Sequence, residues 1–198
     1  MPRLHPLTAA VLIAQFTPAI AQDFEITPFI GWRASSSLEE VNTGATIDVK
    51  ETDSFGFLLS LKQNSSTNYD FLFSRQSTEL QSTTSSNTES LRIDYYQIGG
   101  TVFYGDDKLK PFVTGGLGAT HFSPANNDFS SETKFSLSVG GGLKFPLSRN
   151  IGLRLEARGY GTVVDSGGSI LCSGGCVAQF SGSLFMQFEA SAGLSIAF

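Results

Sequence analysis

The sequence predicts an all-β protein: an eight-stranded antiparallel up-and-down β-barrel, preceded by a cleaved signal peptide. Three observations predict this fold class. Eight segments carry apolar side chains at every second position, no segment repeats at helical spacing, and the polar connections alternate between short and long. Period two is the spacing of a strand with one apolar face. The chain also lacks a run of about 18 apolar residues, so no membrane helix is predicted.

Residues 1–21 are predicted to be a secretory signal peptide. Arg3 precedes the apolar stretch "LTAAVLIAQF" (7–16), and Ala19 and Ala21 form a small-x-small cleavage site. The alternative is a buried first helix, but prolines bracket the segment and nothing later matches its period. We therefore expect the mature barrel domain to span residues 22–198.

The first four predicted strands span 23–33, 47–62, 68–80 and 90–104. Their alternating apolar side chains are Phe24, Ile26, Pro28, Ile30 and Trp32 in the first; Phe55, Phe57, Leu59 and Leu61 in the second; and Tyr69, Phe71 and Phe73 in the third. The fourth strand changes phase, with Leu91, Ile93 and Tyr95 on one face and Tyr96, Ile98 and Val102 on the other. We expect a β-bulge near Tyr95 to reconcile the two phases.

The last four predicted strands span 110–122, 133–146, 150–163 and 179–198, of which the first is weak and rich in glycine. The apolar faces of the other three carry Phe135, Leu137, Val139, Leu143 and Phe145; Ile151, Leu153, Leu155 and Ala157; and Phe188, Ala190, Ala192, Leu194, Ile196 and Phe198. The opposite faces are rich in Gly, Ser and Thr with a few charges, which suits a narrow polar interior.

Connection lengths indicate how the barrel is oriented. Short turns at 63–68, 105–110 and 146–150 alternate with longer polar stretches near 34–46, 81–89, 123–132 and 164–178. A barrel inserted into a membrane from inside the cell has short turns on the inner rim and long loops on the outer rim. Both termini are then expected on the short-turn side.

Alternation alone does not distinguish a lipid-facing barrel from a soluble one, whose apolar face points inward. The spacing from Phe188 to Phe198 favours lipid, because ten residues at a strand tilt near 40° span ~25 Å, the height of the apolar band. Pairing of the last strand with the first would also remove the exposed edges that an open sheet leaves in a membrane.

Charge and cysteine content narrow the classes of function. Without Arg3, 12 basic residues face 18 acidic ones, a balance that argues against a nucleic-acid partner. Cys172 and Cys176 enclose "SGG", which in an exported chain predicts a local disulfide. Closing so short a loop contributes only about 2 kcal/mol, so it would pin a loop and not hold up the fold. The mature chain has a single histidine, His121, so neither a metal site nor a cofactor is expected.

The chain resembles the small eight-stranded outer-membrane barrels of Gram-negative bacteria, the OmpA-like and opacity-protein group. The resembling stretches are "EITPFIGWR" (25–33), "YQIGGTVFY" (96–104), "PFVTGGLGA" (111–119), "GLRLEARGY" (152–160) and the closing strand that ends in Phe198. The resemblance implies a bacterial outer-membrane location, contact with outer-membrane lipid, and Phe198 as the signal read by the barrel assembly machinery. The chain carries no peptidoglycan-binding domain after the barrel, so a cell-wall tether is not implied.

Charged residues on the polar faces predict an ion-pair network in the lumen. Arg154, Glu156 and Arg158 share one face of a strand, and the neighbouring strands carry Glu189 and Glu25, with Lys144 also in reach. Buried charges must pair. The network could simply order the barrel or could form a charge gate for small solutes, although eight strands leave an interior barely wide enough for side chains.

Two further hypotheses concern the outer rim. His121, Ser123 and Glu132 faintly resemble the His-x-Ser and acid of outer-membrane lipid A deacylases, but no glycine-framed nucleophile turn is present. We therefore predict no catalytic residues and no enzyme. The long loops either shield the rim or bind a surface ligand. We expect a monomer with a structural or surface-interaction role, with a narrow channel as the alternative and a lipid A hydrolase as the remote one.

Overall fold

The structure is a computed structural model of the chain and describes residues 24–36, 38–39, 46–82, 88–105, 108–124, 130–163, 169–172, 176–179 and 184–198. The predicted signal peptide, 1–21, lies outside the described residues. The barrel wall is built from eight long strands: β1 (Phe24–Ser35), β4 (Thr52–Lys62), β5 (Thr67–Ser82), β6 (Thr88–Phe103), β7 (Lys110–Pro124), β8 (Glu132–Pro146), β9 (Ile151–Val163) and β12 (Leu184–Ala197). These match the eight predicted strands, so the all-β prediction is confirmed.

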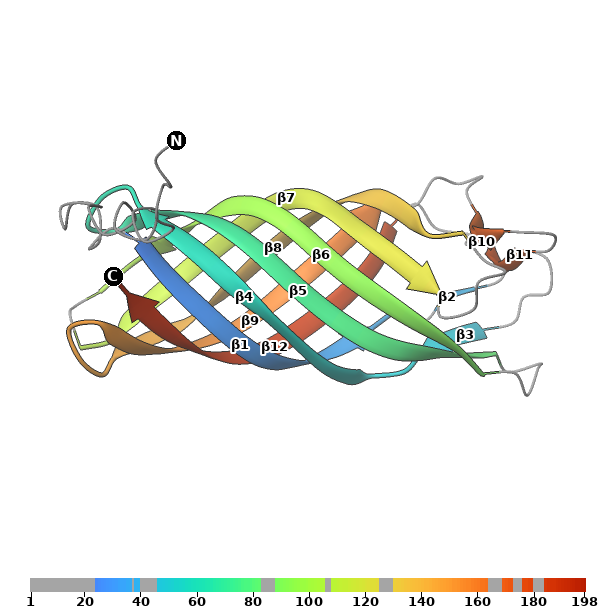
Figure 1. The fold of residues 1–198 in the computed structure, drawn as a ribbon, viewed down its shortest axis with the longest axis horizontal. Helices are drawn as coiled ribbons and strands as arrows, with labels where there is room; N and C mark the ends of the chain where they lie inside the picture. The colour runs from blue at the N-terminus through green and yellow to red at the C-terminus, as the bar shows by residue number, and fades with distance from the viewer. Residues whose placement is uncertain are drawn as a thin grey trace, which may run out of the picture.

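Every wall strand pairs antiparallel with its neighbours in chain order, and the barrel closes where β1 pairs with β12 (Figure 1). In this closing seam Glu25 lies opposite Ala197 and Ser35 opposite Gln187. Closure leaves the wall without an unpaired edge, which is the condition for a sheet to lie in lipid. Within the described part of the chain, no helix is long and apolar enough to cross a membrane.

The two ends of the barrel differ, as the connection lengths predict. The end that carries Phe24, Phe198 and the short turns is called here the terminal end, and the opposite end is the loop end (Figure 1). The turns at the terminal end are tight. Gln63 N–H donates to Thr67 O at 2.9 Å, and Gly105 adopts a φ of 81°, which residues other than glycine rarely adopt.

The loop end carries four short strands: β2 (Leu38–Glu39), β3 (Thr46–Val49), β10 (Ser169–Cys172) and β11 (Cys176–Gln179). Strand β3 pairs with β2 and with the end of β5. Because β4 also pairs with β5, β3 continues the course of β4 past the end of that strand. The single strand predicted over 47–62 is thus interrupted at Lys50 and Glu51. Strands β10 and β11 form a separate hairpin.

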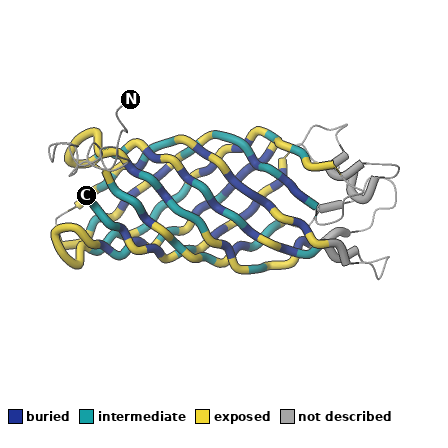
Figure 2. The backbone as a smooth tube through the Cα atoms, in the orientation of Figure 1, coloured by how far each residue is buried: buried dark blue, intermediate teal, exposed yellow. Residues whose placement is uncertain are grey.

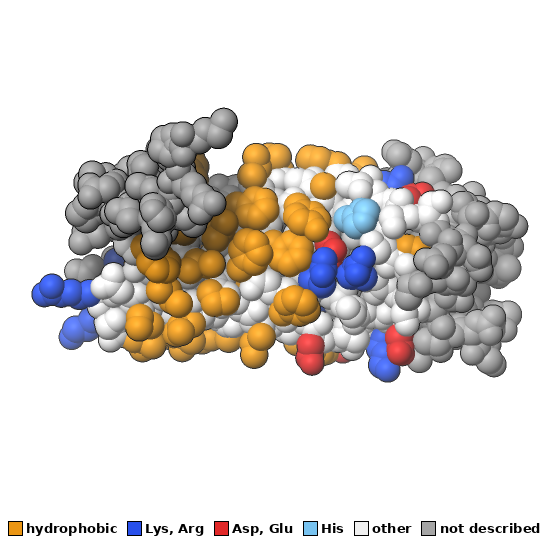
Figure 3. All heavy atoms as spheres, viewed as in Figure 1, with side chains coloured by type: hydrophobic (Ala, Val, Ile, Leu, Met, Phe, Trp, Pro, Cys, Tyr) orange, Lys and Arg blue, Asp and Glu red, His pale blue; other side chains and the backbone are white. Residues whose placement is uncertain are grey.

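Burial alternates along each wall strand (Figure 2). The outward side chains are apolar and exposed: Ile30 is 73 % exposed and Val139 64 %, and Leu194 also points out. They form the hydrophobic surface seen in Figure 3. The inward side chains are mostly small or polar, such as Thr27, Ser138 and Ser195. This is the lipid-facing arrangement that the sequence predicts and the reverse of a soluble barrel.

The predicted β-bulge near Tyr95 is wrong. Strand β6 keeps one unbroken register through this point, with Tyr95 opposite Ser74 on β5 and opposite Thr120 on β7. Leu91, Ile93 and Tyr95 instead point inward, where each is at most 6 % exposed. The phase change in the sequence therefore marks the point where the interior of the barrel turns from polar to apolar, not a kink in the strand.

Candidate functional site

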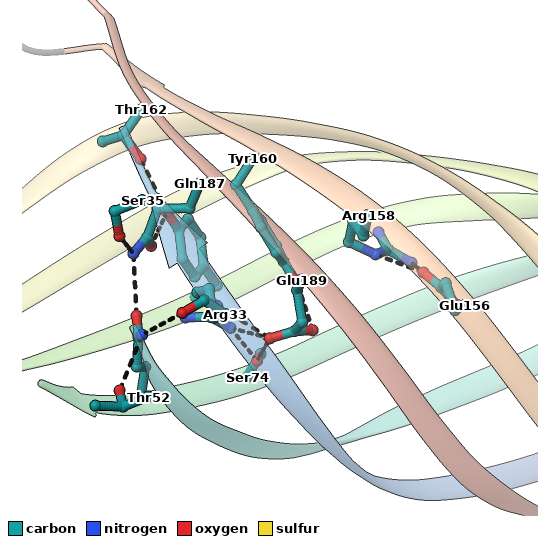
Figure 4. Close-up of polar contacts among 12 residues, drawn as sticks. Arg33, Ser35, Thr52, Ser74, Glu156, Arg158, Tyr160, Thr162, Gln187 and Glu189 are labelled. Atoms are coloured by element: carbon teal, nitrogen blue, oxygen red, sulfur yellow. Dashed lines mark hydrogen bonds and ion pairs between the residues drawn. The ribbon is translucent and has the colours of Figure 1, made fainter. Parts of the chain in front are cut away.

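A buried polar cluster lies inside the barrel against the closing seam (Figure 4). Arg33 on β1 is the direct cross-strand partner of Glu189 on β12. The Arg33 Nε donates to Glu189 Oε2 at 3.0 Å, and Arg33 Nη2 also contacts this oxygen and Ser74 Oγ. The two charged side chains are 0 % and 3 % exposed, so this is a fully desolvated ion pair.

Two tyrosines hold the guanidinium of Arg33 in place. The rings of Tyr95 and Tyr160 stack with centroids 4.2 Å apart, and the Arg33 Cζ lies 5.0 Å from each centroid. Such cation–π contacts strengthen when water is excluded. The Tyr160 hydroxyl donates to Glu189 Oε1 at 3.1 Å, so the carboxylate is fixed at both oxygens.

Neutral side chains extend this cluster across the interior. The Tyr95 hydroxyl donates to Gln187 Oε1 at 2.8 Å. The Gln187 Nε2 donates to Ser35 Oγ and to Gln76 Oε1, at 2.7 and 3.0 Å (Figure 4). These hydrogen bonds run from strand to strand, so the cluster connects β1, β5, β6, β9 and β12 into one hydrogen-bonded unit.

A second group lies along β9. Arg154, Glu156 and Arg158 are spaced two residues apart and all point inward, as the sequence predicts. Glu156 bridges the two arginines: Arg154 Nε donates to one carboxylate oxygen at 2.8 Å and Arg158 Nε to the other at 2.7 Å. The Arg158 Nη1 also donates to Ser138 Oγ at 3.0 Å. The Arg154 Cζ lies 3.9 Å from the ring centroid of Phe112.

A third pair, Lys144 and Glu25, lies towards the terminal end, with the Lys144 Nζ 5.6 Å from the ring centroid of Phe103. The six residues of the predicted network thus all point inward but fall into three groups along the barrel. Arg33, the partner of Glu189, was not predicted as part of this network. The sequence indicated only that Arg33 lies on the inward face of the first strand. The pairing of Arg33 with Glu189 depends on the register in which β1 and β12 close the barrel.

Apolar side chains also pack inside the barrel. The buried cluster consists of Val49, Leu58, Leu72, Leu91, Ile93, Tyr95, Phe122, Tyr160 and Phe185. Most of these residues lie towards the loop end, whereas Leu58 and Leu72 lie nearer the terminal end, with Leu72 at the level of Glu156 and Arg158. At the level of Arg158 and Glu189 a cavity of about 10 Å³ remains, the space of about one water molecule. The interior is therefore packed with side chains at both levels.

The lipid A deacylase hypothesis needs His121, Ser123 and Glu132 on one face. In the structure Glu132 is the cross-strand partner of Phe122, whose side chain points inward, whereas His121 is the partner of Thr133 on the outer face. The His121 Nδ1 lies 2.9 Å from Thr133 Oγ1. Glu132 and His121 therefore lie on opposite sides of the wall. No group of three metal-ligating side chains comes together among the residues described.

The predicted disulfide falls in the β10–β11 hairpin. Cys172 and Cys176 are direct cross-strand partners there, which is a backbone spacing that a disulfide can bridge. Their side chains lie outside the described part of the structure, so the disulfide stays a prediction.

Comparisons with known proteins agree with this architecture. Neisserial surface protein A (NspA) superimposes with a TM-score of 0.64 at 13 % identity, over 88 % of this chain and 97 % of that one. The outer membrane protein OprG from Pseudomonas aeruginosa gives a TM-score of 0.60 at 12 % identity, over 90 % and 96 %. The outer membrane protein AlkL, solved in lipid bilayers, gives 0.60 at 16 % identity, over 100 % and 97 %.

These likenesses are similarities of fold, and no curated protein sequence matches the chain significantly. The family described as outer membrane protein beta-barrel domain matches residues 7–170. The chain therefore belongs to this family, and it is a small β-barrel protein of the Gram-negative outer membrane.

Proposed function

We propose that this protein has a surface-interaction role, with the barrel as a rigid scaffold and the loop end as the binding surface. The observation that carries the proposal is the difference between the two ends of the barrel: the terminal end has short turns, and the loop end has long connections with strands of their own. At the loop end β3 pairs with the end of β5 beyond β4, β2 pairs with β3, and β10 and β11 form a further hairpin. Binding residues commonly lie on such extensions of a rigid scaffold.

The sequence of the loop end restricts the chemistry of the partner. The four long connections between wall strands, 36–51, 83–87, 125–131 and 164–183, contain a single basic residue, Lys50, against six acidic ones: Glu39, Glu40, Asp48, Glu51, Asp128 and Asp165. A surface of this composition repels polyanions such as nucleic acids and sulfated glycans. The partner that fits is a neutral or basic surface, such as that of a host protein.

The packed lumen supports a binding role over transport. Arg33 and Tyr160 are at most 1 % exposed inside the barrel, and Ile93, Phe122 and Phe185 of the buried apolar cluster fill the interior towards the loop end. A solute would have to displace a paired arginine and several aromatic rings. The alternative of a narrow channel has one supporting observation, a hollow of about 250 Å³ at the terminal end, lined in part by Lys62, Lys144 and Glu25.

Adhesion of cells tests the proposal. Val163 and Leu184 are direct partners at the loop end, so residues 164–183 can be replaced by an Asn-Gly turn without changing the wall. We expect cells that display the intact protein to adhere to immobilised host matrix proteins, and the shortened protein to lose adhesion. The matched control replaces Ser65 and Ser66 in a terminal-end turn with Asn-Gly. Equal adhesion by intact and shortened proteins, with both folded, contradicts the proposal.

A further inference from the structure

A charged cluster interrupts the outer wall at the loop-end border of the hydrophobic surface. Going towards the loop end, outward apolar residues on β5 end at Phe73 and are followed by Arg75, while those on β6 end at Tyr96 and are followed by Asp94 and Arg92. Figure 3 shows basic, acidic and histidine side chains gathered beside the hydrophobic band. This border is where acyl chains give way to lipid headgroups.

Arg75 forms a bidentate ion pair within this cluster. It is the direct partner of Asp94, and its Nε and Nη2 donate to the two carboxylate oxygens at 2.7 and 2.8 Å. Its Cζ also lies 5.4 Å from the ring centroid of Phe73. Asp94 is only 3 % exposed although it points outward, because neighbouring side chains cover it. A bidentate pair of this kind orients the guanidinium before any ligand arrives.

The cluster carries more positive than negative charge. Arg92 shares the same carboxylate, with its Nε 3.7 Å from Asp94 Oδ2, and is 49 % exposed. One carboxylate therefore faces two guanidinium groups, and His121 is the cross-strand partner of Asp94 on the other side. An unbalanced charge at the edge of hydrocarbon is costly unless an anion lies beside it.

A hollow of about 390 Å³ adjoins this cluster on the loop-end side. Ser77, Ser90, Arg92 and Ser123 line part of it, together with the ion pair of Lys50 and Glu79. Hydroxyl groups and basic side chains around one hollow suit a ligand that is both phosphorylated and rich in hydroxyls. On the terminal-end side of the cluster, Phe73 and Tyr96 form an apolar surface, with ring centroids 5.2 Å apart.

We propose that Arg75 and Arg92 bind a phosphate of a phosphorylated glycolipid, of the lipid A type, in the outer leaflet. Its sugar hydroxyls would occupy the serine-lined hollow and its acyl chains would lie along Phe73 and Tyr96. Arginine suits phosphate because its planar fork donates two parallel hydrogen bonds. None of these residues belongs to the segment 164–183, so the adhesion test, which removes only that segment, and the test below can fail separately.

Native mass spectrometry of the purified barrel tests the proposal, with bisphosphorylated lipid A as the probe. We expect the Arg92→Gln variant to bind it about fivefold more weakly than the wild type. The matched control is Arg149→Gln, which removes the same charge from an exposed turn at the terminal end and should leave binding unchanged. Lipid A stripped of its phosphates should bind the wild type at least as weakly as the variant binds the intact lipid, because it loses the contacts of both arginines.

Three outcomes overturn the proposal. Arg92→Gln binds like the wild type; Arg149→Gln loses as much affinity as Arg92→Gln; or inorganic phosphate at millimolar concentration displaces the lipid completely, which would indicate a site for the free anion. Heat-modifiable migration on gels verifies that each variant is folded.

Discussion

Arg33 and Glu189 are 156 residues apart in the sequence and lie directly opposite each other across the seam that closes the barrel. Because the pair is fully buried, its two charges depend on each other. Removing one partner leaves a charge without water or a counter-ion, which costs more than the pair contributes to stability.

We predict that Glu189→Ala lowers the free energy of unfolding by about 3–5 kcal/mol. Replacing both partners, Arg33→Met with Glu189→Leu, should recover most of this loss because no charge is then left unpaired. Denaturant unfolding in lipid vesicles measures the effect, with the single tryptophan, Trp32, as the fluorescent probe next to the site.

The exposed pair of Lys50 and Glu79, 55 % and 43 % exposed, supplies the control for this experiment. Glu79→Ala should cost no more than about 1 kcal/mol. If the double replacement at Arg33 and Glu189 is as unstable as Glu189→Ala alone, the loss does not come from an unpaired charge.

The outward face of the barrel gives a depth-dependent prediction. Val139 lies at the middle of the outward apolar run of β8, whereas Val163 ends β9 at the loop end, and both point outward. Val139→Arg should lower the free energy of unfolding by roughly 2–4 kcal/mol and Val163→Arg by no more than about 1 kcal/mol. Reversible folding into vesicles measures both; equal costs would argue against lipid at Val139.

The sequence was sufficient for the fold because a two-residue period reports directly which side chains share a face. It was insufficient where a side chain's environment depends on strands distant in the chain. Tyr95 was assigned to a bulge because an apolar residue was expected to point outward, whereas the loop end of the lumen is itself apolar. Arg33 was left without a partner because only the register of closure places it opposite Glu189.

The space around the backbone distinguishes an inward glycine, Gly142, from an outward one, Gly115. A Cβ atom at Gly142 would lie 2.0 Å from Leu155 O and 2.7 Å from Phe112 Cζ, whereas at Gly115 its nearest neighbour would be Ser138 O at 3.7 Å. Gly142→Ala should therefore lower the free energy of unfolding by about 1–3 kcal/mol or more, the usual cost of overpacking. Gly115→Ala should leave the free energy of unfolding nearly unchanged. Thermal unfolding in detergent measures both, and similar midpoints for the two variants would contradict the prediction.

The cysteine pair is predicted to be oxidised in the exported protein. Mass spectrometry after alkylation should show no labelled thiol without reductant and two labelled thiols with it. Cys172→Ser should leave the unfolding of the barrel nearly unchanged, because a hairpin staple worth about 2 kcal/mol lies outside the wall. Labelling of both thiols in unreduced protein would contradict the disulfide.

Conduction tests whether the packed lumen is closed. In planar bilayers we expect no steady single-channel steps from the wild type, and none from Arg158→Ala, because the apolar cluster around Ile93, Phe122 and Phe185 still fills the loop end. Combining Arg158→Ala with Phe122→Ala and Phe185→Ala should open a water path and produce steps, with gel migration verifying that the variant remains folded. Steps in the wild type that change in size with Arg158→Ala alone would instead support the narrow channel, because they would mean that ions pass the Arg158 and Glu156 pair.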